Sequence, residues 1–234
     1  CHMVGSSHRA MLRARVRTRA MGLAFHVHQG WSLEESSNHW FNRALYLLGC
    51  LPPAGYTLED HVPAMILEEG EDPIVVYADR LTELKGAGRF WVQTSRTLAE
   101  KKSTLSYAEF VRTVKRLRIP LVFDTQHFLE YALSVYGVGR LPANSDRLYR
   151  VLEEGWQELK DLVMEIHLVN FNPELGSTRG RNVPLEEGVL PLRDFCQMVK
   201  KSGWEGTVVP EVSRLFWSSG DLRALREQVH GFFK

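Results

Sequence analysis

Short apolar runs that end in a polar, chemically active side chain recur along this sequence. The clearest is residues 120–127 (PLVFDTQH), where an apolar run stops at an aspartate and a histidine follows three positions later. Runs of this length, bounded by proline and polar residues, are typical of strands buried on both faces. A buried carboxylate is costly unless something binds it. Four runs end in this way, at Gln93, Asp124, His167 and Glu211, and they predict one polar site at one end of a sheet.

Strand and helix patterns alternate along the chain, which indicates βαβ units and a parallel sheet. Six strands are expected, over residues 22–28, 72–78, 89–94, 120–125, 162–170 and 207–212. A doubly wound dinucleotide-binding sheet usually has a glycine-rich turn after its first strand, and no such turn follows either of the first two strands here. Catalytic groups at the carboxyl ends of several strands are typical of a TIM barrel. We therefore predict an α/β protein of the (β/α)8 TIM-barrel type, shortened at its N-terminus, with residues 22–234 forming a single domain.

Composition limits the partners that we expect. A net charge of +1 gives no global attraction to nucleic acid or to a membrane, and no apolar run reaches the roughly 18 residues that span a bilayer. The three cysteines form no CxxC pair, which argues against a disulfide framework or a thiolate zinc site. These features favour a cytoplasmic protein. Residues 1–21 are basic and lack acidic residues; a basic surface helix is preferred over a transit peptide.

Oxygen and nitrogen donors at the strand ends suit one divalent metal ion, such as Mn, Mg, Co or Zn. The proposed ligands are Asp124, His167, Glu211 and Gln93. Each has a structural alternative. Asp124 would cap a helix, His167 would be a satisfied core histidine, Glu211 would form an ion pair, and Gln93 would only donate or accept a hydrogen bond.

Four segments resemble the xylose isomerase-like TIM barrels, a superfamily of sugar isomerases and epimerases, inosose dehydratases and endonuclease IV enzymes. Residues 123–127 (FDTQH) are similar to its DTxH strand end, and residues 166–170 (IHLVN) to its HLND strand. Residues 180–189 (GRNVPLEEGV) resemble its GRHxPxGEG loop, and residues 208–212 (VVPEV) its last glutamate-bearing strand. The resemblance covers about residues 22–215.

This resemblance implies a metal-dependent isomerase or epimerase that acts on a small polyhydroxylated substrate in carbohydrate metabolism. In such enzymes one Asp, one His and two Glu hold the metal, and the two Glu move a proton through an enediolate. Glu211 and Glu165 are then the expected catalytic residues, because Gln93 stands where the family has its other Glu. The structural alternative for Glu165, which is favoured over catalysis, is an ion pair with an Arg inside the barrel. The expected substrate-binding residues are His127, His28, Arg179 and Arg181.

The departures from the family pattern leave other functions open. Gln93 lacks a carboxylate, and only six strands are clear. Both features favour the alternative that the chain is a decayed, non-catalytic member that acts as a binding protein. An endonuclease IV-like repair enzyme is less favoured, because residues 180–182 (GRN) replace that group's DRH metal ligands. Six strands do not close an eight-stranded barrel, and a second copy of the chain covering the open edge would make a homo-oligomer.

Overall fold

The computed structural model describes residues 2–4, 26–29, 56–58, 72, 74–76, 78–79, 82, 90–94, 105–135, 137–176, 180–212 and 222–234. The chain divides into two compact units, Cys1–Val122 and Phe123–Lys234, which are described in turn. Most of the basic segment predicted over residues 1–21 lies outside the described residues. The single domain expected over residues 22–234 stays a prediction.

The first unit is built on parallel strands. β1 (His2–Val4) pairs in parallel with β2 (His26–Gln29), β2 with β3 (Tyr56–Leu58), and β3 with β4 (Phe90–Gln93). β4 pairs in parallel with Leu121 and Val122, which begin β5 (Leu121–Asp124); the last two residues of β5 belong to the second unit. Helix α5 (Tyr107–Leu117) precedes β5. It begins with a capping box in which the Ser106 hydroxyl accepts from the amide of Glu109, whose carboxylate accepts from Ser106 in return. The helix buries Phe110 and Val114.

One strand prediction in the first unit is wrong. Residues 72–78 (DPIVVYA) were expected to be extended, but residues 74–76 and 78–79 are helical. Asp72 explains the difference, because its side chain accepts a hydrogen bond from the amide of Ile74 and its carbonyl accepts one from Val76. A capping aspartate followed by proline starts a helix, and this local signal outweighs the β-branched run. The three-residue strands β1 and β3 were not predicted.

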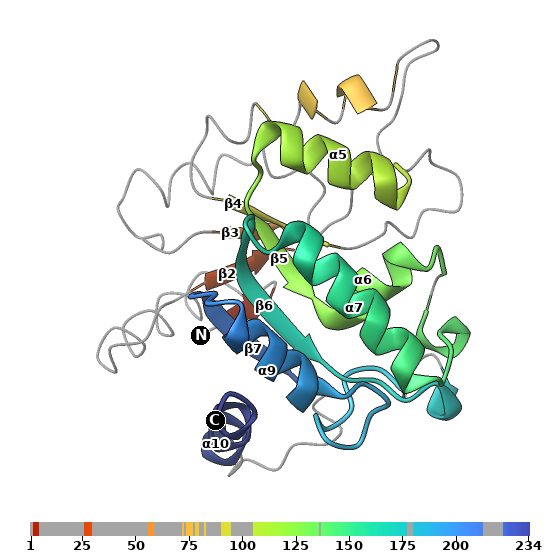
Figure 1. Ribbon diagram of the computed structural model, residues 1–234, viewed down its shortest axis with the longest axis vertical. Helices are drawn as coiled ribbons and strands as arrows, with labels where there is room; N and C mark the ends of the chain where they lie inside the picture. Colours follow the sequence, from red (N-terminus) through yellow and green to blue (C-terminus); the bar gives the residue numbers. More distant parts are fainter. Residues whose placement is uncertain are drawn as a thin grey trace. The chain divides into compact units, whose positions relative to one another are not determined.

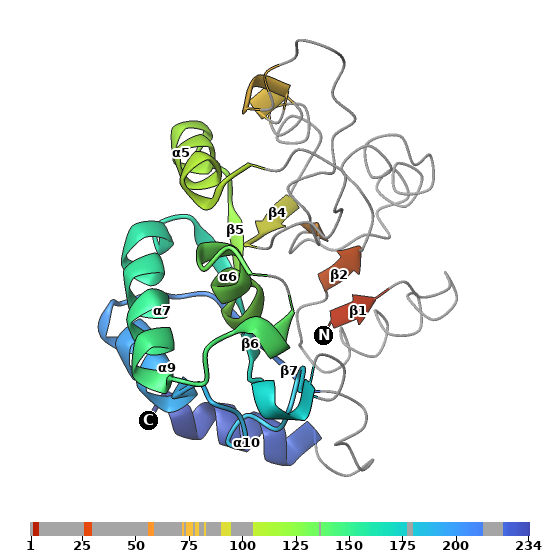
Figure 2. The ribbon, with the colours of Figure 1, turned by 90° about the vertical axis from the view of Figure 1, so that its right-hand side faces the viewer.

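The second unit alternates helices and strands. Its elements are α6 (Thr125–Ala132), the 3-10 helix η1 (Val138–Arg140), α7 (Ser145–Leu159), β6 (Val163–Val169), the 3-10 helix η2 (Pro173–Leu175), α9 (Leu192–Lys201), β7 (Thr207–Glu211) and α10 (Leu222–Phe232). β6 and β7 pair in parallel, with Val169 opposite Glu211. Figures 1 and 2 both show α7 beside α9, and α9 beside α10. The strands expected over residues 120–125, 162–170 and 207–212 are confirmed as β5, β6 and β7.

Aromatic side chains fill the core of the second unit. The Phe123 ring stacks on Phe128 with centroids 4.6 Å apart and meets the edge of Trp156 at 5.7 Å. Phe195 of α9 packs on both Phe123 and Trp156. At Gly155 of α7 an added Cβ would overlap the Phe128 ring, so α6 and α7 approach closely. Phe123 is therefore packed on several sides. Asp124, the next residue, consequently stands at a rigid strand end.

The thiol of Cys196 is buried in α9. Burial raises the pKa of this thiol to about 12, against a small lowering effect of Arg193. Because the thiolate is the reactive species, we expect iodoacetamide to leave Cys196 unmodified in the folded protein at pH 8 and to modify it once urea unfolds the chain. Peptide mass spectrometry measures both rates. Equal rates in the two states would show that the α9 face is open.

Among the helices formed by the described residues, none combines the length and the apolar character needed to cross a bilayer.

Candidate metal centre

Asp124 stands at the junction of β5 and α6, and its two carboxylate oxygens contact different groups. Oδ1 accepts from the backbone amides of Gln126 and His127 at 2.9 and 2.8 Å, which caps α6. Oδ2 lies 3.9 Å from Nδ1 of His167. The helix-capping alternative is therefore correct for one oxygen, and the other oxygen points toward the candidate site. Capping also fixes the rotation of the carboxylate.

The hydroxyl of Thr125 joins the start of α6 to β6. It donates to the carbonyl of Val169 at 2.7 Å and accepts from the amide of the same residue at 2.9 Å. Thr125 is fully buried, so both bonds form away from water, where they are strongest. These bonds set Asp124, at the end of β5, at a defined distance from His167 in β6.

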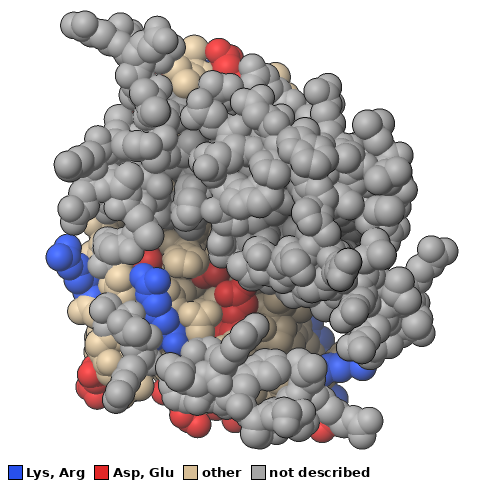
Figure 3. Space-filling model, turned by 180° about the vertical axis from the view of Figure 1, so that it is seen from behind, with Lys and Arg blue, Asp and Glu red and all other residues tan. Residues whose placement is uncertain are grey.

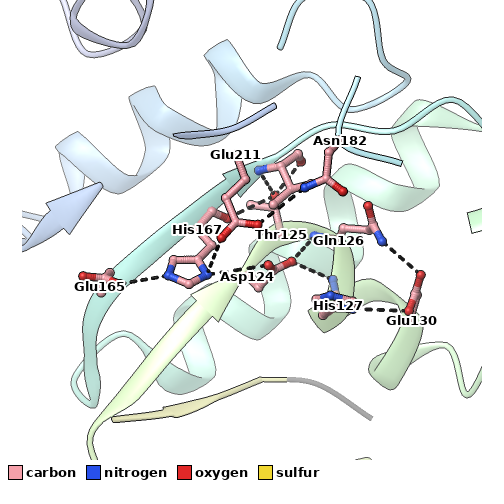
Figure 4. Close-up of polar contacts among 10 residues, drawn as sticks. Asp124, Thr125, Gln126, His127, Glu130, Glu165, His167, Asn182 and Glu211 are labelled. Carbon is pink, nitrogen blue, oxygen red and sulfur yellow. Dashed lines mark hydrogen bonds and ion pairs between the residues drawn. The ribbon is translucent and has the colours of Figure 1, made fainter. Parts of the chain in front are cut away.

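Asp124, His167 and Glu211 come together at the ends of three strands. One ligand atom from each of the three residues can be chosen so that all lie within 4.8 Å of one another. Nδ1 of His167 lies 3.2 Å from Oε1 of Glu211. The side chains of Asp124 and His167 are buried, whereas that of Glu211 is 25% exposed. Figure 4 shows the three groups pointing toward one another.

The imidazole of His167 is surrounded by negative charge. Its Nε2 lies 2.8 Å from Oε1 of Glu165, which is also buried. Burial lowers the pKa of His167, but the hydrogen bond that the ring makes to Glu165 and the charges of Glu211 and Asp124 outweigh burial and raise it. Three carboxylates around one imidazole place excess negative charge in a buried site, and a cation would neutralise it.

The loop after β6 supplies a neighbour for Glu211. Asn182 lies in this loop with a positive φ of 49°, a conformation that asparagine tolerates better than most residues. Its Nδ2 donates to Oε2 of Glu211 at 3.5 Å. Glu211 is thereby held between an imidazole on one oxygen and an amide on the other.

His127 and Glu130 form a second polar pair on α6. Nδ1 of His127 lies 3.4 Å from Oε2 of Glu130, and the His127 side chain is 34% exposed. Gln126 donates from Nε2 to the other Glu130 oxygen, while its own buried Oε1 has no hydrogen-bond partner among the described residues. Burial lowers the pKa of His127, but Asp124 and Glu130, with a contribution from Glu211, raise it to about 9.

The remaining predicted site residues are spread over both units. Gln93 ends β4 in the first unit and is buried, and its role as a ligand stays a prediction. His28 lies in β2, whose side chains are not described. Arg179 lies outside the described residues. Arg181 is partly exposed, and its buried Nε has no hydrogen-bond partner in the described part of the chain.

Several residues around the site were not predicted to take part in it: Thr125, Asn170, Asn182 and Glu130. The participation of one of them, Glu130, could have been predicted from the sequence. His127 and Glu130 are three positions apart at the start of a helix, a spacing that brings side chains together. The contacts of Asn182 and Asn170 depend on the path of the long loop after β6, which the sequence does not specify.

The donor set fits a divalent cation. Two carboxylates and one imidazole are ligands that Mn, Co, Zn and related ions accept in proteins. Three protein ligands, with space for a substrate or water as the next ligand, are typical of catalytic rather than structural sites.

Comparison with known proteins agrees with this fold. The sequence profile of the family described as xylose isomerase-like TIM barrel matches residues 94–228. None of the curated proteins compared with the sequence is similar enough to count as a match.

Solved structures are similar to the chain at low identity. A xylose isomerase domain containing protein from Salmonella typhimurium LT2 has a TM-score of 0.62 and 12% identity, covering 99% of this chain and 86% of its own. L-ribulose 3-epimerase has a TM-score of 0.56 and 12% identity, with coverages of 97% and 75%. Mannonate dehydratase from Streptococcus suis serotype 2 has a TM-score of 0.51 and 10% identity, with coverages of 99% and 92%. Such identities show the fold alone.

The profile covers more than half of the sequence, and the similar structures share its fold class. The chain is therefore an α/β protein of the TIM-barrel type and belongs to the xylose isomerase-like TIM barrel family.

Proposed function

We propose that this protein is a metal-dependent isomerase or epimerase that acts on a small polyhydroxylated carbohydrate. The observation that carries the proposal is the convergence of Asp124, His167 and Glu211, whose ligand atoms lie within 4.8 Å of one another. Membership of the family adds support. Among the similar structures, one is an L-ribulose 3-epimerase and another a D-allulose 3-epimerase in complex with D-allulose.

The metal would be held by Asp124, His167 and Glu211, and Gln93 is the proposed fourth protein ligand. When bound, a divalent cation polarises the carbonyl and hydroxyl oxygens of a sugar and so makes the neighbouring C–H group more acidic. The protein supplies the base that takes this proton. Glu211 suits the role best, because its carboxylate is partly exposed while that of Asp124 is buried.

Substrate would approach from the exposed side of the site. The His127 side chain, 34% exposed, is available to bind a sugar hydroxyl. Arg181 carries a buried Nε without a partner among the described residues, and a guanidinium so placed would donate to a hydroxyl or phosphate oxygen. Both assignments rest on the proposed function.

Proton exchange with solvent tests the proposal. An enzyme that removes a proton from the carbon beside a carbonyl incorporates deuterium there when it turns over in D2O. We expect the protein loaded with Mn²⁺, Co²⁺ or Zn²⁺ to label at least one member of a panel of ketoses and ketose phosphates, as read by NMR. The protein stripped by a chelator is the control. Failure to bind any divalent ion would refute the proposal.

The main alternative is a family member that binds a sugar without turnover, which the amide at Gln93 favours. Binding of a ketose without deuterium exchange in any metal-loaded form would support it. The endonuclease function is less favoured. On the described part of the face in Figure 3, acidic and basic side chains are both present, whereas a duplex-binding face is expected to be basic.

A further inference from the structure

We propose that Glu165 is a positioning residue for His167, holding the imidazole by Nε2 so that Nδ1 faces the candidate metal centre. This inference rests on the proposed function, because it assumes that His167 is a ligand. It differs from the sequence-based expectation that Glu165 moves a proton to or from the substrate.

The position of Glu165 follows from the strand. Residues two apart on a β-strand point to the same side, so Glu165 and His167 of β6 share a face. Their side chains are both buried, and Oε1 of Glu165 lies 2.8 Å from Nε2 of His167. On the other side of the ring, Nδ1 lies 3.2 Å from Glu211 and 3.9 Å from Asp124. Figure 4 shows the imidazole standing between Glu165 and the other two carboxylates.

This arrangement selects one nitrogen for the metal. A neutral imidazole has one N–H donor and one lone pair, and an ionised carboxylate only accepts hydrogen bonds. With a cation held between Nδ1 and the carboxylates of Glu211 and Asp124, the Nδ1 lone pair would face the cation, and the proton would stay on Nε2, where Glu165 accepts it. A hydrogen bond to the second ring nitrogen is a common way to fix both the tautomer and the orientation of a metal-ligating histidine.

The same geometry argues against direct contact between Glu165 and substrate. The Glu165 side chain is fully buried, with its Oε1 on the side of His167 that faces away from Glu211. Glu211, by contrast, is 25% exposed. A sugar that reaches Glu211 would meet the imidazole before it met Glu165.

The test compares Glu165→Leu and Glu165→Gln with the wild-type chain and with Met164→Gln. Met164 precedes Glu165 on β6 and is 48% exposed, so its replacement controls for a polar change in the same strand. Zinc affinity is measured by competition with a chelating dye. We expect Glu165→Leu to weaken zinc binding about 10- to 100-fold, the usual effect of removing an outer partner of a ligand. Glu165→Gln, which keeps a weaker neutral acceptor, should lose less, about threefold or more. Met164→Gln should match the wild type.

A second readout separates positioning from a general loss of structure. In 15N-labelled, zinc-loaded protein, long-range 1H–15N correlations report which nitrogen of His167 carries the proton. We expect Nε2–H in the wild type and a mixed or Nδ1-protonated imidazole in Glu165→Leu. If Glu165→Leu does not fold, the zinc affinity of Glu165→Gln decides.

The outcomes are distinct. Unchanged affinity and an unchanged tautomer in the folded Glu165 variants would overturn this inference and leave the proposed function intact. A wild-type chain that binds no divalent ion would refute the proposed function itself.

Discussion

Replacing His167 by alanine should weaken zinc or manganese binding by more than about 100-fold, because loss of an outer partner of a ligand alone costs 10- to 100-fold. His167 is the group on which the site converges, with Nδ1 facing both Glu211 and Asp124. Without the imidazole, the site keeps only two of its three converging ligands, Asp124 and Glu211. The measurement is a metal titration followed by the deuterium-exchange assay on the ketose panel, in which exchange should disappear.

The matched control for this variant is His230→Ala. His230 lies on α10 and is exposed, so its replacement removes an imidazole without touching the site. Circular dichroism checks that His167→Ala is folded at the assay temperature, and His167→Gln, which keeps a polar side chain, replaces it if it is not. Metal binding equal to that of His230→Ala would show that His167 is not a ligand.

The sequence was informative about this site because the decisive signals are local. An apolar run followed by a carboxylate or an imidazole identifies the end of a strand, and parallel strands present their carboxyl ends at one edge. Asp124, His167 and Glu211 could therefore be grouped from three separate segments. The structure places them together within 4.8 Å.

Features that depend on competing local signals or on distant contacts were not accessible in the same way. Residues 72–78 have the composition of a strand, yet the cap at Asp72 starts a helix there. β1 and β3 have only three residues each, too few for a periodic pattern. The contact between Asn182 and Glu211 joins residues 29 apart, and it depends on a loop path that no spacing rule predicts.

That loop is organised by one buried side chain, Asn170, at the end of β6. Its Nδ2 donates to the carbonyls of Leu185 and Leu190 at 2.7 and 3.1 Å, and its Oδ1 accepts from the amides of Phe171 and Leu190 at 2.9 and 3.0 Å. At Gly188 an added Cβ would overlap the Asn170 side chain, so the loop closes tightly around the amide. Asn170 thus supplies hydrogen-bond partners to four buried backbone groups, one of which, the Leu190 carbonyl, also accepts from the amide of Leu192.

Asn170→Asp should therefore lower the free energy of unfolding by about 2–5 kcal/mol, since each buried polar group left unsatisfied costs roughly 1–3 kcal/mol and charged groups cost more. The substitution keeps the shape and the acceptor Oδ1, but it turns the two donated bonds into contacts between a carboxylate and two carbonyl oxygens. Urea unfolding followed by tryptophan fluorescence measures the change.

Asn172→Asp is the control, because it is the same chemical change in the same loop. Asn172 is only partly buried and uses its Oδ1 to accept from the amide of Glu174. Aspartate retains this bond, so the substitution should change the free energy of unfolding by no more than about 0.5 kcal/mol.

Metal affinity supplies a second comparison. If the Asn170 network holds the loop that carries Asn182 against Glu211, Asn170→Asp should weaken metal binding at a urea concentration where the chain is still folded, and Asn172→Asp should not. Equal unfolding free energies for the two variants would mean that the loop is held by its backbone bonds to β6 rather than by the Asn170 amide.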